Sequence, residues 1–436
     1  MTQAARRRMR AIVRAAVLGT LTALVLTSCS DGHLDVRSVP AAGWSSYGGN
    51  SANSNFSYAR PPSDLALSWT RPTGGPVTSP VTMNGGGDVV VGANTPTGCN
   101  LLVLDNRNGR KNFCKRMANG FWGNAALVDQ FAQPYLGEPG RFLALTGGGA
   151  IRWRKDVIGV PTSAKFVGPG HVLITTSLGR LMIVNAQTGD PVGPEKALWT
   201  RPATDPLTGF GDCVTGGPEC AVSAPPAVDW GHERVFLNFF PEGARTSQVK
   251  ALGYAREDHE RTLTDLWSAD LPGGVVGAPT VSADGKTVYA FGRDGRLYAL
   301  DAADGAVRWS HDNSGYGFGT MSVSPDGTIV PAGTIGAPLV ILHDDGDKAV
   351  EVARRDDVQT AGLSAQTAAG TVWTVVRSGP ELQLELMEVD AKTGATKRTL
   401  PMPEAKGFAT GVAVSAAGQI AVATNIGAVY YFSPES

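Results

Sequence analysis

Short hydrophobic runs separated by turns that contain Gly and Asp recur along most of this 436-residue chain. In the clearest unit, residues 278–309, three such runs are separated by Asp284-Gly285 and Asp294-Gly295, and a fourth run ends on Trp309. Short apolar runs bounded by Asp-Gly pairs predict antiparallel strands joined by tight turns. Residues 322–342 and 412–432 follow the same plan.

The last turn of this unit runs from Asp301 to Gly305 and is the best-preserved part of the repeat. The Asp301 carboxylate can accept hydrogen bonds from the turn backbone, and Gly305 can adopt a positive φ at little cost. The pattern predicts a hairpin that is plugged by Trp309. Weaker copies are centred on Gly109, Gly149, Gly189, Gly253, Gly346 and Gly394, and a partial copy ends at Phe432.

Four short strands per unit, at a period of roughly 40–48 residues, are typical of the blades of a β-propeller. The last unit lacks its fourth strand, which residues 65–71, with Trp69, can supply. We therefore predict an all-β fold: an eight-bladed propeller over residues 44–436, closed by an N-terminal strand. Trp69, Trp153, Trp267 and Trp309 are predicted to pack between blades; carbohydrate binding is the alternative role for such a Trp series.

The repeat Ala299-x-Asp301-x-x-Asp304-Gly305-x-x-x-Trp309 resembles that of the pyrroloquinoline-quinone (PQQ)-type propeller family. The opening Gly43-Trp44-Ser45-Ser46-Tyr47-Gly48-Gly49-Asn50 is similar to the start of such domains. The family includes quinone-dependent dehydrogenases and non-enzymatic lipoproteins similar to outer-membrane assembly factor B. In the dehydrogenases, the resemblance implies adjacent cysteines at the quinone and a calcium held by acidic and amide side chains. Here no two cysteines are adjacent, which argues against a complete quinoprotein dehydrogenase.

The N-terminus has the pattern of a secretory signal. Five arginines precede the largely apolar run 15–26, which is too short to span a bilayer. The following Leu26-Thr27-Ser28-Cys29 is similar to the bacterial lipobox, which implies that residues 1–28 are removed and Cys29 is acylated. An ordinary signal peptide is the alternative. Residues 29–43 are polar and aperiodic and predict a flexible tether.

Four cysteines remain in the exported domain: Cys99, Cys114, Cys213 and Cys220. In an oxidising compartment disulfides are expected. Three connectivities are possible, and local pairing of Cys99 with Cys114 and of Cys213 with Cys220 is favoured because each pair is close in sequence. A metal site is the alternative, but the chain has no Cys-x-x-Cys spacing.

The charge of the chain does not indicate nucleic acid as a partner. Removal of residues 1–28 lowers the number of basic residues from 38 to 33 and leaves 39 acidic ones, a net charge of −6. No nucleophile–base pattern is evident, and residues 343–347 predict a solvated turn rather than a calcium loop. We therefore expect no catalytic residues, cofactor or metal.

These patterns favour a membrane-anchored scaffold on the extracytoplasmic side that binds an exported or envelope protein. The alternatives are an enzyme or binding protein that takes a quinone, metal or sugar in the central channel, and an extracellular sensor. Function is expected in the loops. The most distinctive loops are 191–225, which carries Cys213 and Cys220, the polar loop 255–265, and the stretch 311–320, whose Tyr316 and Phe318 could line a channel mouth or simply pack in a linker.

Overall fold

The fold is built almost entirely from strands. The computed structural model describes residues 36–96, 98–118, 124–257, 260–313, 315, 319–331, 336–378 and 382–435. The chain divides into two compact units, residues 1–37 and 38–436, and every described strand lies in the second. Within the described residues the one helix is the four-residue α2 (Phe210–Cys213), and no helix is long and apolar enough to cross a membrane. The prediction of an all-β fold is confirmed for the described residues.

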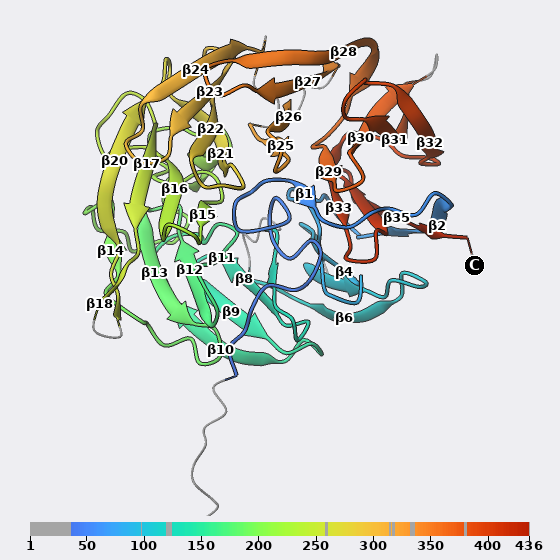
Figure 1. Ribbon diagram of the computed structural model, residues 1–436. Helices are drawn as coiled ribbons and strands as arrows, with labels where there is room; N and C mark the ends of the chain where they lie inside the picture. Colours follow the sequence, from blue (N-terminus) through green and yellow to red (C-terminus); the bar gives the residue numbers. More distant parts are fainter. Residues whose placement is uncertain are drawn as a thin grey trace, which may run out of the picture. The chain divides into compact units, whose positions relative to one another are not determined.

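Six antiparallel sheets of four strands contain most of the described strands. Five of them are formed by strands that follow one another along the chain: β3 (Thr82–Met83), β4 (Val89–Gly92), β5 (Leu101–Leu104) and β6 (Lys111–Lys115); β7 (Leu127–Val128), β8 (Pro134–Glu138), β9 (Arg141–Leu145) and β10 (Ile151–Asp156); β11 (Lys165–Phe166), β12 (His171–Thr175), β13 (Arg180–Asn185) and β14 (Lys196–Ala197); β15 (Ala227–Asp229), β16 (Arg234–Phe239), β17 (Gln248–Gly253) and β20 (Thr264–Asp270); and β21 (Val275–Val281), β22 (Thr287–Gly292), β23 (Arg296–Asp301) and β24 (Val307–Asp312). Figure 1 shows these sheets following one another in chain order.

The sixth sheet joins the two ends of the folded unit. It contains β33 (Ala409–Val414), β34 (Ile420–Thr424) and β35 (Ala428–Pro434), with β2 (Leu65–Pro72) added as its fourth strand. The β2–β35 register runs from Leu65 opposite Pro434 to Pro72 opposite Ala428. The N-terminal strand therefore completes the sheet that ends the chain.

A nine-stranded sheet contains the next two units of the repeat. It consists of β25 (Met321–Val323), β26 (Thr328–Pro331), β27 (Pro338–Asp344), β28 (Ala349–Thr360), β29 (Ala365–Thr367), β30 (Thr371–Ser378), β31 (Gln383–Asp390) and β32 (Thr396–Pro401), with β1 (Phe56–Ser57) parallel to β29. The last residues of β28 pair with β30 and so join the two units. The sequence pattern did not predict β28, because most of this outermost strand is exposed on both faces and shows no hydrophobic alternation.

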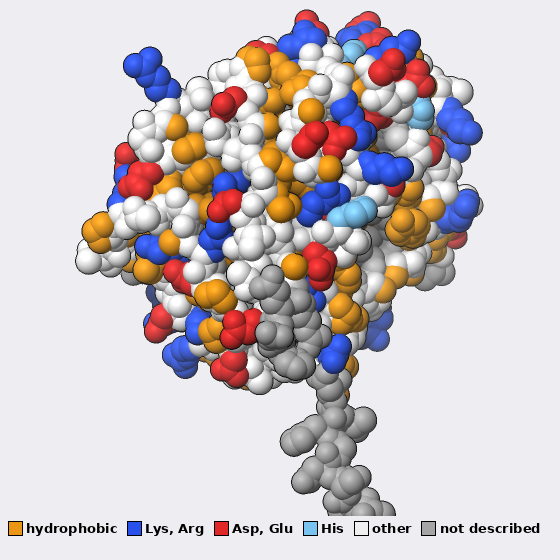
Figure 2. All heavy atoms as spheres, turned by 60° about the vertical axis from the view of Figure 1, so that its left-hand side comes forward, with side chains coloured by type: hydrophobic (Ala, Val, Ile, Leu, Met, Phe, Trp, Pro, Cys, Tyr) orange, Lys and Arg blue, Asp and Glu red, His pale blue; other side chains and the backbone are white. Residues whose placement is uncertain are grey.

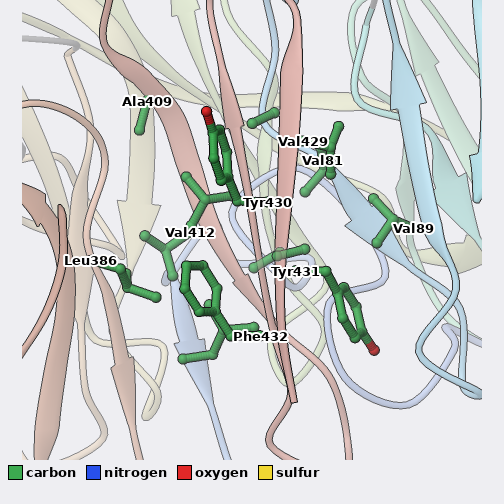
Figure 3. Close-up of a cluster of buried hydrophobic side chains, with 14 of the residues drawn as sticks. Val81, Val89, Leu386, Ala409, Val412, Val429, Tyr430, Tyr431 and Phe432 are labelled. Atoms are coloured by element: carbon green, nitrogen blue, oxygen red, sulfur yellow. The ribbon is translucent and has the colours of Figure 1, made fainter. Parts of the chain in front are cut away.

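The largest buried cluster spans both chain ends. Tyr430, Tyr431 and Phe432 of β35 are at most 2% exposed. Their side chains alternate between the two faces of the sheet: Tyr431 points toward Val89 of β4, whereas Phe432 points toward Leu386 of β31 (Figure 3). The sheet that closes the chain is thus buried against both of its neighbours.

Tryptophan side chains of outermost strands pack on the hairpin glycine of the next sheet. A Cβ at Gly109 would lie 2.7 Å from the Trp69 ring, and one at Gly189 would lie 2.7 Å from Trp153. Each indole N–H donates to a carbonyl of the turn it contacts; the Trp69 bond, to the Asn106 carbonyl, is 3.0 Å. The tryptophans of the repeat therefore lie between sheets, and none of them lines the cavities described below.

The hairpin of the best-preserved repeat has the geometry that its residues predict. Asp301 Oδ1 accepts the Ala303 N–H at 2.8 Å, and the Gly305 N–H donates to the Asp301 carbonyl at 2.8 Å, with φ +78° at Gly305. A Cβ at Gly305 would lie 2.5 Å from Trp267 of the preceding sheet. Trp309 in turn donates to Asp344 Oδ1 at 2.9 Å. In this weak copy of the repeat, centred on Gly346, a carboxylate therefore accepts the indole bond in place of a backbone carbonyl.

The predicted tether is too long at its C-terminal end. Ser38 is fully buried, and its hydroxyl donates to Asp129 Oδ2 at 2.9 Å. The Ala41 N–H donates to the Val128 carbonyl at 2.9 Å, and Pro40 forms a β-bridge with Asp129. Residues 38–43 therefore belong to the folded unit, and a tether after Cys29 can extend only to residue 37. Cys29 itself lies outside the described residues.

Part of the predicted polar loop 255–265 is strand rather than loop. It contains a small hairpin of β18 (Arg256–Glu257) and β19 (Glu260–Arg261) and the start of β20. Arg261 fixes this hairpin, since its Nη1 lies 3.2 Å from Glu233 Oε1. Tyr316 and Phe318, for which lining a channel mouth and packing in a linker were the two predicted roles, lie outside the described residues.

Candidate functional site

Residues 44–57, the hub segment, contact the first strands of seven sheet units. Backbone carbonyls of Trp44, Ser45, Ser51, Ala52, Ser54 and Asn55 accept N–H bonds from Met83, Val128, Val228, Val281, Val323 and Gln366, respectively, at 2.7–3.0 Å. The Ser51 hydroxyl donates to the Phe166 carbonyl of β11 at 3.2 Å. Figure 1 shows this segment, in blue, lying among the surrounding sheets. The hub segment therefore links the sheets. Its residue Tyr47 also lines the two cavities described below, and we call the hub segment and its contacts the floor of that site.

Asn53 and Asn55 hold the hub segment from within. Asn53 is fully buried, and its amide Nδ2 lies 3.1 Å from the Pro226 carbonyl and 3.0 Å from the Pro279 carbonyl. Asn55 Nδ2 donates to the Met321 carbonyl at 2.9 Å. Both residues have positive φ, a conformation that asparagine adopts more readily than most residues. The Gly/Asn/Ser-rich run is therefore a structural element rather than a loop.

Lys165 is a buried amine below the hub segment. Its Nζ donates to the carbonyls of Tyr47 and Asn50, at 2.5 and 2.7 Å, and to the Ser46 hydroxyl at 3.2 Å. Burial lowers the pKa of this amine well below its usual value of 10.5. Two carbonyls and one hydroxyl surround the amine, so Lys165 fastens the hub segment to β11.

We expect Lys165→Met to change the pH dependence of stability. Because the pKa of Lys165 is lowered in the folded state, the unfolded chain binds the proton more tightly, and the free energy of unfolding rises with pH up to about 10.5. Lys165→Met should lack this rise. Urea unfolding between pH 7 and 9.5 measures it, with the exposed Lys286→Met as control; parallel profiles for all three proteins would contradict the assignment.

The loop of residues 198–225, the cap loop, lies over the other side of the hub segment. A disulfide joins Cys213 to Cys220, with their Cα atoms 5.1 Å apart. Asp212, inside this loop, accepts the Gly217 N–H on its carbonyl and the Glu219 N–H on Oδ2, at 2.8 and 3.0 Å. The Arg293 guanidinium from the β22–β23 turn donates to the carbonyls of Thr215 and Gly216, at 2.5 and 2.9 Å. The cap loop is therefore held by its own bonds and by a neighbouring sheet.

Two adjoining cavities, the cap-loop cavities, lie between the cap loop and the hub segment. Their volumes are about 310 and 640 Å³. Both are lined by Tyr47, Thr78, Cys213, Val214, Ser223 and Pro225. Val214 also faces solvent, with 69% of its surface exposed. An exposed apolar side chain thus lines two cavities, of which the larger is the more polar.

The cap-loop cavities combine neutral hydrogen-bonding groups with apolar side chains. The smaller one is mainly apolar, with Val160, Phe210 and Val222 in its lining, and it adds hydroxyls, including those of Ser163 and Ser177, and the Asn124 amide. Burial raises the pKa of Tyr47 to about 12, with a Thr320 hydrogen bond opposing the shift, so the phenol is neutral at physiological pH. Among the described residues that line the two cavities, Arg293 carries the only formal charge. Such a lining suits uncharged polar groups such as peptide bonds.

These residues do not fit a quinone site of the dehydrogenase kind. Cys213, the cysteine in both linings, is bonded to Cys220 rather than to an adjacent cysteine. The described residues of both linings include no carboxylate to hold calcium, and in the described part of the chain no group of three His, Cys, Asp or Glu residues could hold a metal. The second disulfide joins Cys99 to Cys114, so both predicted local pairs are present.

Sequence reasoning identified the cap loop and Cys213 but missed the floor of the site. Tyr47 and Lys165 were not predicted as neighbours, because only the register of the hub segment against each sheet brings them together. The sequence signal that could have pointed to Tyr47 was the Gly43–Asn50 opening, but it was interpreted only as the start of a domain. Cys29, the predicted lipidation site, lies outside the described residues.

The repeated hairpins, the indole contacts between sheets and the four-stranded sheets define a PQQ-type β-propeller. A family model described as outer membrane protein assembly factor BamB matches residues 259–436. Protein Rv3035 of Mycobacterium tuberculosis is 33% identical over 413 residues, covering 93% of this chain and 99% of that protein. The chain therefore belongs to the same protein family as Protein Rv3035, and its residues 259–436 match the PQQ-type repeat model.

Solved structures share the fold at low sequence identity. Quinohemoprotein alcohol dehydrogenase from Comamonas testosteroni is similar with a TM-score of 0.63 and 14% identity, covering 93% of this chain and 83% of that one. BamB from Moraxella catarrhalis has a TM-score of 0.58 and 15% identity, covering 85% and 99%. An enzyme and an assembly factor both share this architecture. The fold alone therefore does not show which of these functions a protein has.

Proposed function

We propose that this protein is a lipid-anchored, extracytoplasmic scaffold that binds segments of exported or envelope proteins at the cap loop. The observation that carries the proposal is the disulfide-closed loop, which presents exposed Val214 beside cavities lined by apolar side chains and neutral hydrogen-bonding groups. An apolar anchor beside polar groups that can pair with peptide bonds is typical of a surface that binds polypeptide. The family match to an assembly factor supports this choice.

The scaffold is proposed to be an eight-bladed propeller closed by β2. Eight short first strands support this count: β3, β7, β11, β15, β21, β25, β29 and β33. The β2–β35 pairing and the stacked rings of Trp69 and Tyr431, with centroids 4.8 Å apart, support closure between the chain ends. A closed ring protects strand edges and gives the loops a rigid base.

The anchor is proposed to be Cys29, with residues 1–28 removed. The second compact unit begins at Ser38, so the proposed tether comprises the nine residues 29–37. An extended chain spans at most about 3.6 Å per residue, which limits the tether to about 30 Å. The propeller would therefore work close to the membrane surface, and two acyl chains would suffice for stable anchoring. Figure 2 shows acidic and basic side chains interspersed over one face, without a one-sign patch in that view.

We expect Cys29→Ser to release the protein from the membrane. The variant should lose incorporation of a labelled fatty acid and move from the membrane to the soluble extracytoplasmic fraction. Ser28→Ala, which keeps a small side chain before the cysteine, is the matched control. Membrane retention of Cys29→Ser would contradict lipid anchoring at this residue.

The alternative is an enzyme or binding protein that uses a quinone, a metal or a sugar in the same cavities. Its support is the 640 Å³ volume and polar lining of the larger cavity. The purified mature protein separates the two functions. Stoichiometric quinone or metal, or dye-linked oxidation of alcohols, would contradict the scaffold proposal.

A further inference from the structure

A third cavity lies where β15 and β21 end, whereas the cap-loop cavities lie where these strands begin. Its volume is about 450 Å³, and it is bounded by the hub segment and by the turns after β15 and β21. The residues that matter for its chemistry are Asp229, Trp230, His232 and Asp284. Two of these four are carboxylates, and the described lining includes no lysine or arginine. The cavity therefore differs in charge from the cap-loop cavities, where Arg293 is the charged residue.

Trp230 is held in a fixed orientation at this cavity. Its indole N–H donates to the Phe166 carbonyl of β11 at 2.6 Å, while 37% of its surface stays exposed. Because the polar edge of the indole is already satisfied, the ring can offer only its π surface and carbon edge to a ligand. This Trp is unlike Trp69, Trp153 and Trp267 of the repeat, which pack against the glycine of a neighbouring hairpin.

The two carboxylates differ in availability. Asp229 is buried and fully engaged: Oδ2 accepts the Arg234 guanidinium at 2.9 Å and lies 2.8 Å from His232 Nδ1, and Oδ1 accepts the Gly231 N–H at 3.0 Å. The Asp284 side chain is 56% exposed, and its Oδ2 faces only Lys286 Nζ, at 3.7 Å. That pair is weak, because the Lys286 side chain is 72% exposed and surface ion pairs contribute little.

Asp284 is charged at neutral pH. Burial would raise the pKa of Asp284, but the Ser282 hydroxyl and the Lys286 backbone N–H, which donate to Oδ1 at 2.7 and 3.1 Å, outweigh that effect and place the pKa below its usual value. A fixed aromatic ring and an available carboxylate that line the same cavity can bind a cation by the ring quadrupole and by charge together.

We propose that this cavity binds an alkylammonium or alkylguanidinium group, such as the end of a lysine or arginine side chain. The apolar stem of such a group suits the lining contributed by Ala41, Val228 and Val281. The charged end would lie between the Trp230 ring and Asp284. The site is separate from the cap loop and does not depend on the function proposed there.

Titration of the full chain with Nα-acetyl-lysine N-methylamide tests the site, read from the NMR signal of the Trp230 indole N–H. That signal is assigned by its loss in Trp230→Phe. We expect the lysine derivative to shift it and the norleucine derivative, which lacks the ammonium group, to leave it unchanged. Asp284→Asn should weaken binding about fivefold or more, since its amide oxygen keeps the turn bonds but removes the charge, and Trp230→Leu should weaken binding about tenfold. For Trp230→Leu, binding is read by calorimetry.

Asp345→Asn, on a distant exposed turn, is the matched control and should bind as the wild type does. Tighter binding of acetyl-Gly-Lys-Gly-amide than of n-butylammonium would identify a polypeptide side chain as the source, and equal affinity would identify a free alkylamine. Equal binding of the norleucine and lysine derivatives would overturn the proposal, as would an unchanged affinity in Asp284→Asn. The Asn variant keeps the test decisive even where Trp230→Leu does not fold.

Discussion

Gly305→Ala should lower the free energy of unfolding by about 2–5 kcal/mol, since both a positive φ and a steric clash oppose the new methyl group. The left-handed conformation at φ +78° accounts for about 1–2 kcal/mol of this for a residue with a Cβ. The remainder comes from the added Cβ, which would lie 2.5 Å from the Trp267 ring. Urea unfolding at 25 °C measures the loss.

Gly346→Ala is the matched control. It occupies the same place in the degenerate copy of the repeat, with φ +91°, but a Cβ there would have nothing within 4 Å. We expect a loss of only about 1–2 kcal/mol, the cost of the backbone alone. Equal losses in the two variants would show that the Trp267–Gly305 contact between sheets contributes nothing to stability.

Asn53→Ala should destabilise the protein by about 2–5 kcal/mol, because each buried carbonyl left without a donor costs about 1–3 kcal/mol. The Asn53 amide lies within 3.3 Å of three carbonyls, those of Pro225, Pro226 and Pro279, from two sheets. At φ +58° alanine also carries backbone strain. Thermal and urea unfolding would show a lower midpoint in both.

Two further variants separate the hydrogen bonds from the backbone strain. Asn55→Ala has the same strain, at φ +45°, but its amide serves chiefly the Met321 carbonyl at 2.9 Å, so its loss should be smaller. Asn53→Asp preserves size and conformation but replaces the donor with a carboxylate oxygen, and should be at least as damaging as Asn53→Ala. A stable Asn53→Asp would show that these bonds do not hold the hub segment.

Local patterns were sufficient to predict the strands and hairpins of the well-preserved repeats, although not β28 or the small β18–β19 hairpin. Asp301 and Gly305 determine their turn through contacts within five residues, so the sequence displays the requirement directly. The spacing of the cysteines likewise predicted both disulfides, because each pair closes a short loop. In both cases the residues that contact each other are close together in the sequence, so the contact can be predicted from a short stretch of it.

The floor of the site depends on contacts between distant residues and left little local signal. The Lys165 amine contacts Tyr47 and Asn50, more than 110 positions away. A buried lysine looks like any strand lysine in the sequence, and its burial follows only from the passage of the hub segment over β11. The predicted tether was too long for the same reason. Ser38 is polar, and only its hydrogen bond to Asp129 explains why it is buried.

The most direct test of the scaffold proposal is photo-crosslinking from position 214 in intact cells. Val214→benzoyl-phenylalanine in the full-length chain places the probe at the exposed edge of the cap-loop cavities. Ile426, 52% exposed on the β34–β35 turn and outside those linings, is the control position. If the protein is such a scaffold, we expect covalent adducts with exported or envelope proteins from position 214 and few from position 426. No adducts from position 214, or the same adducts from both positions, would contradict it.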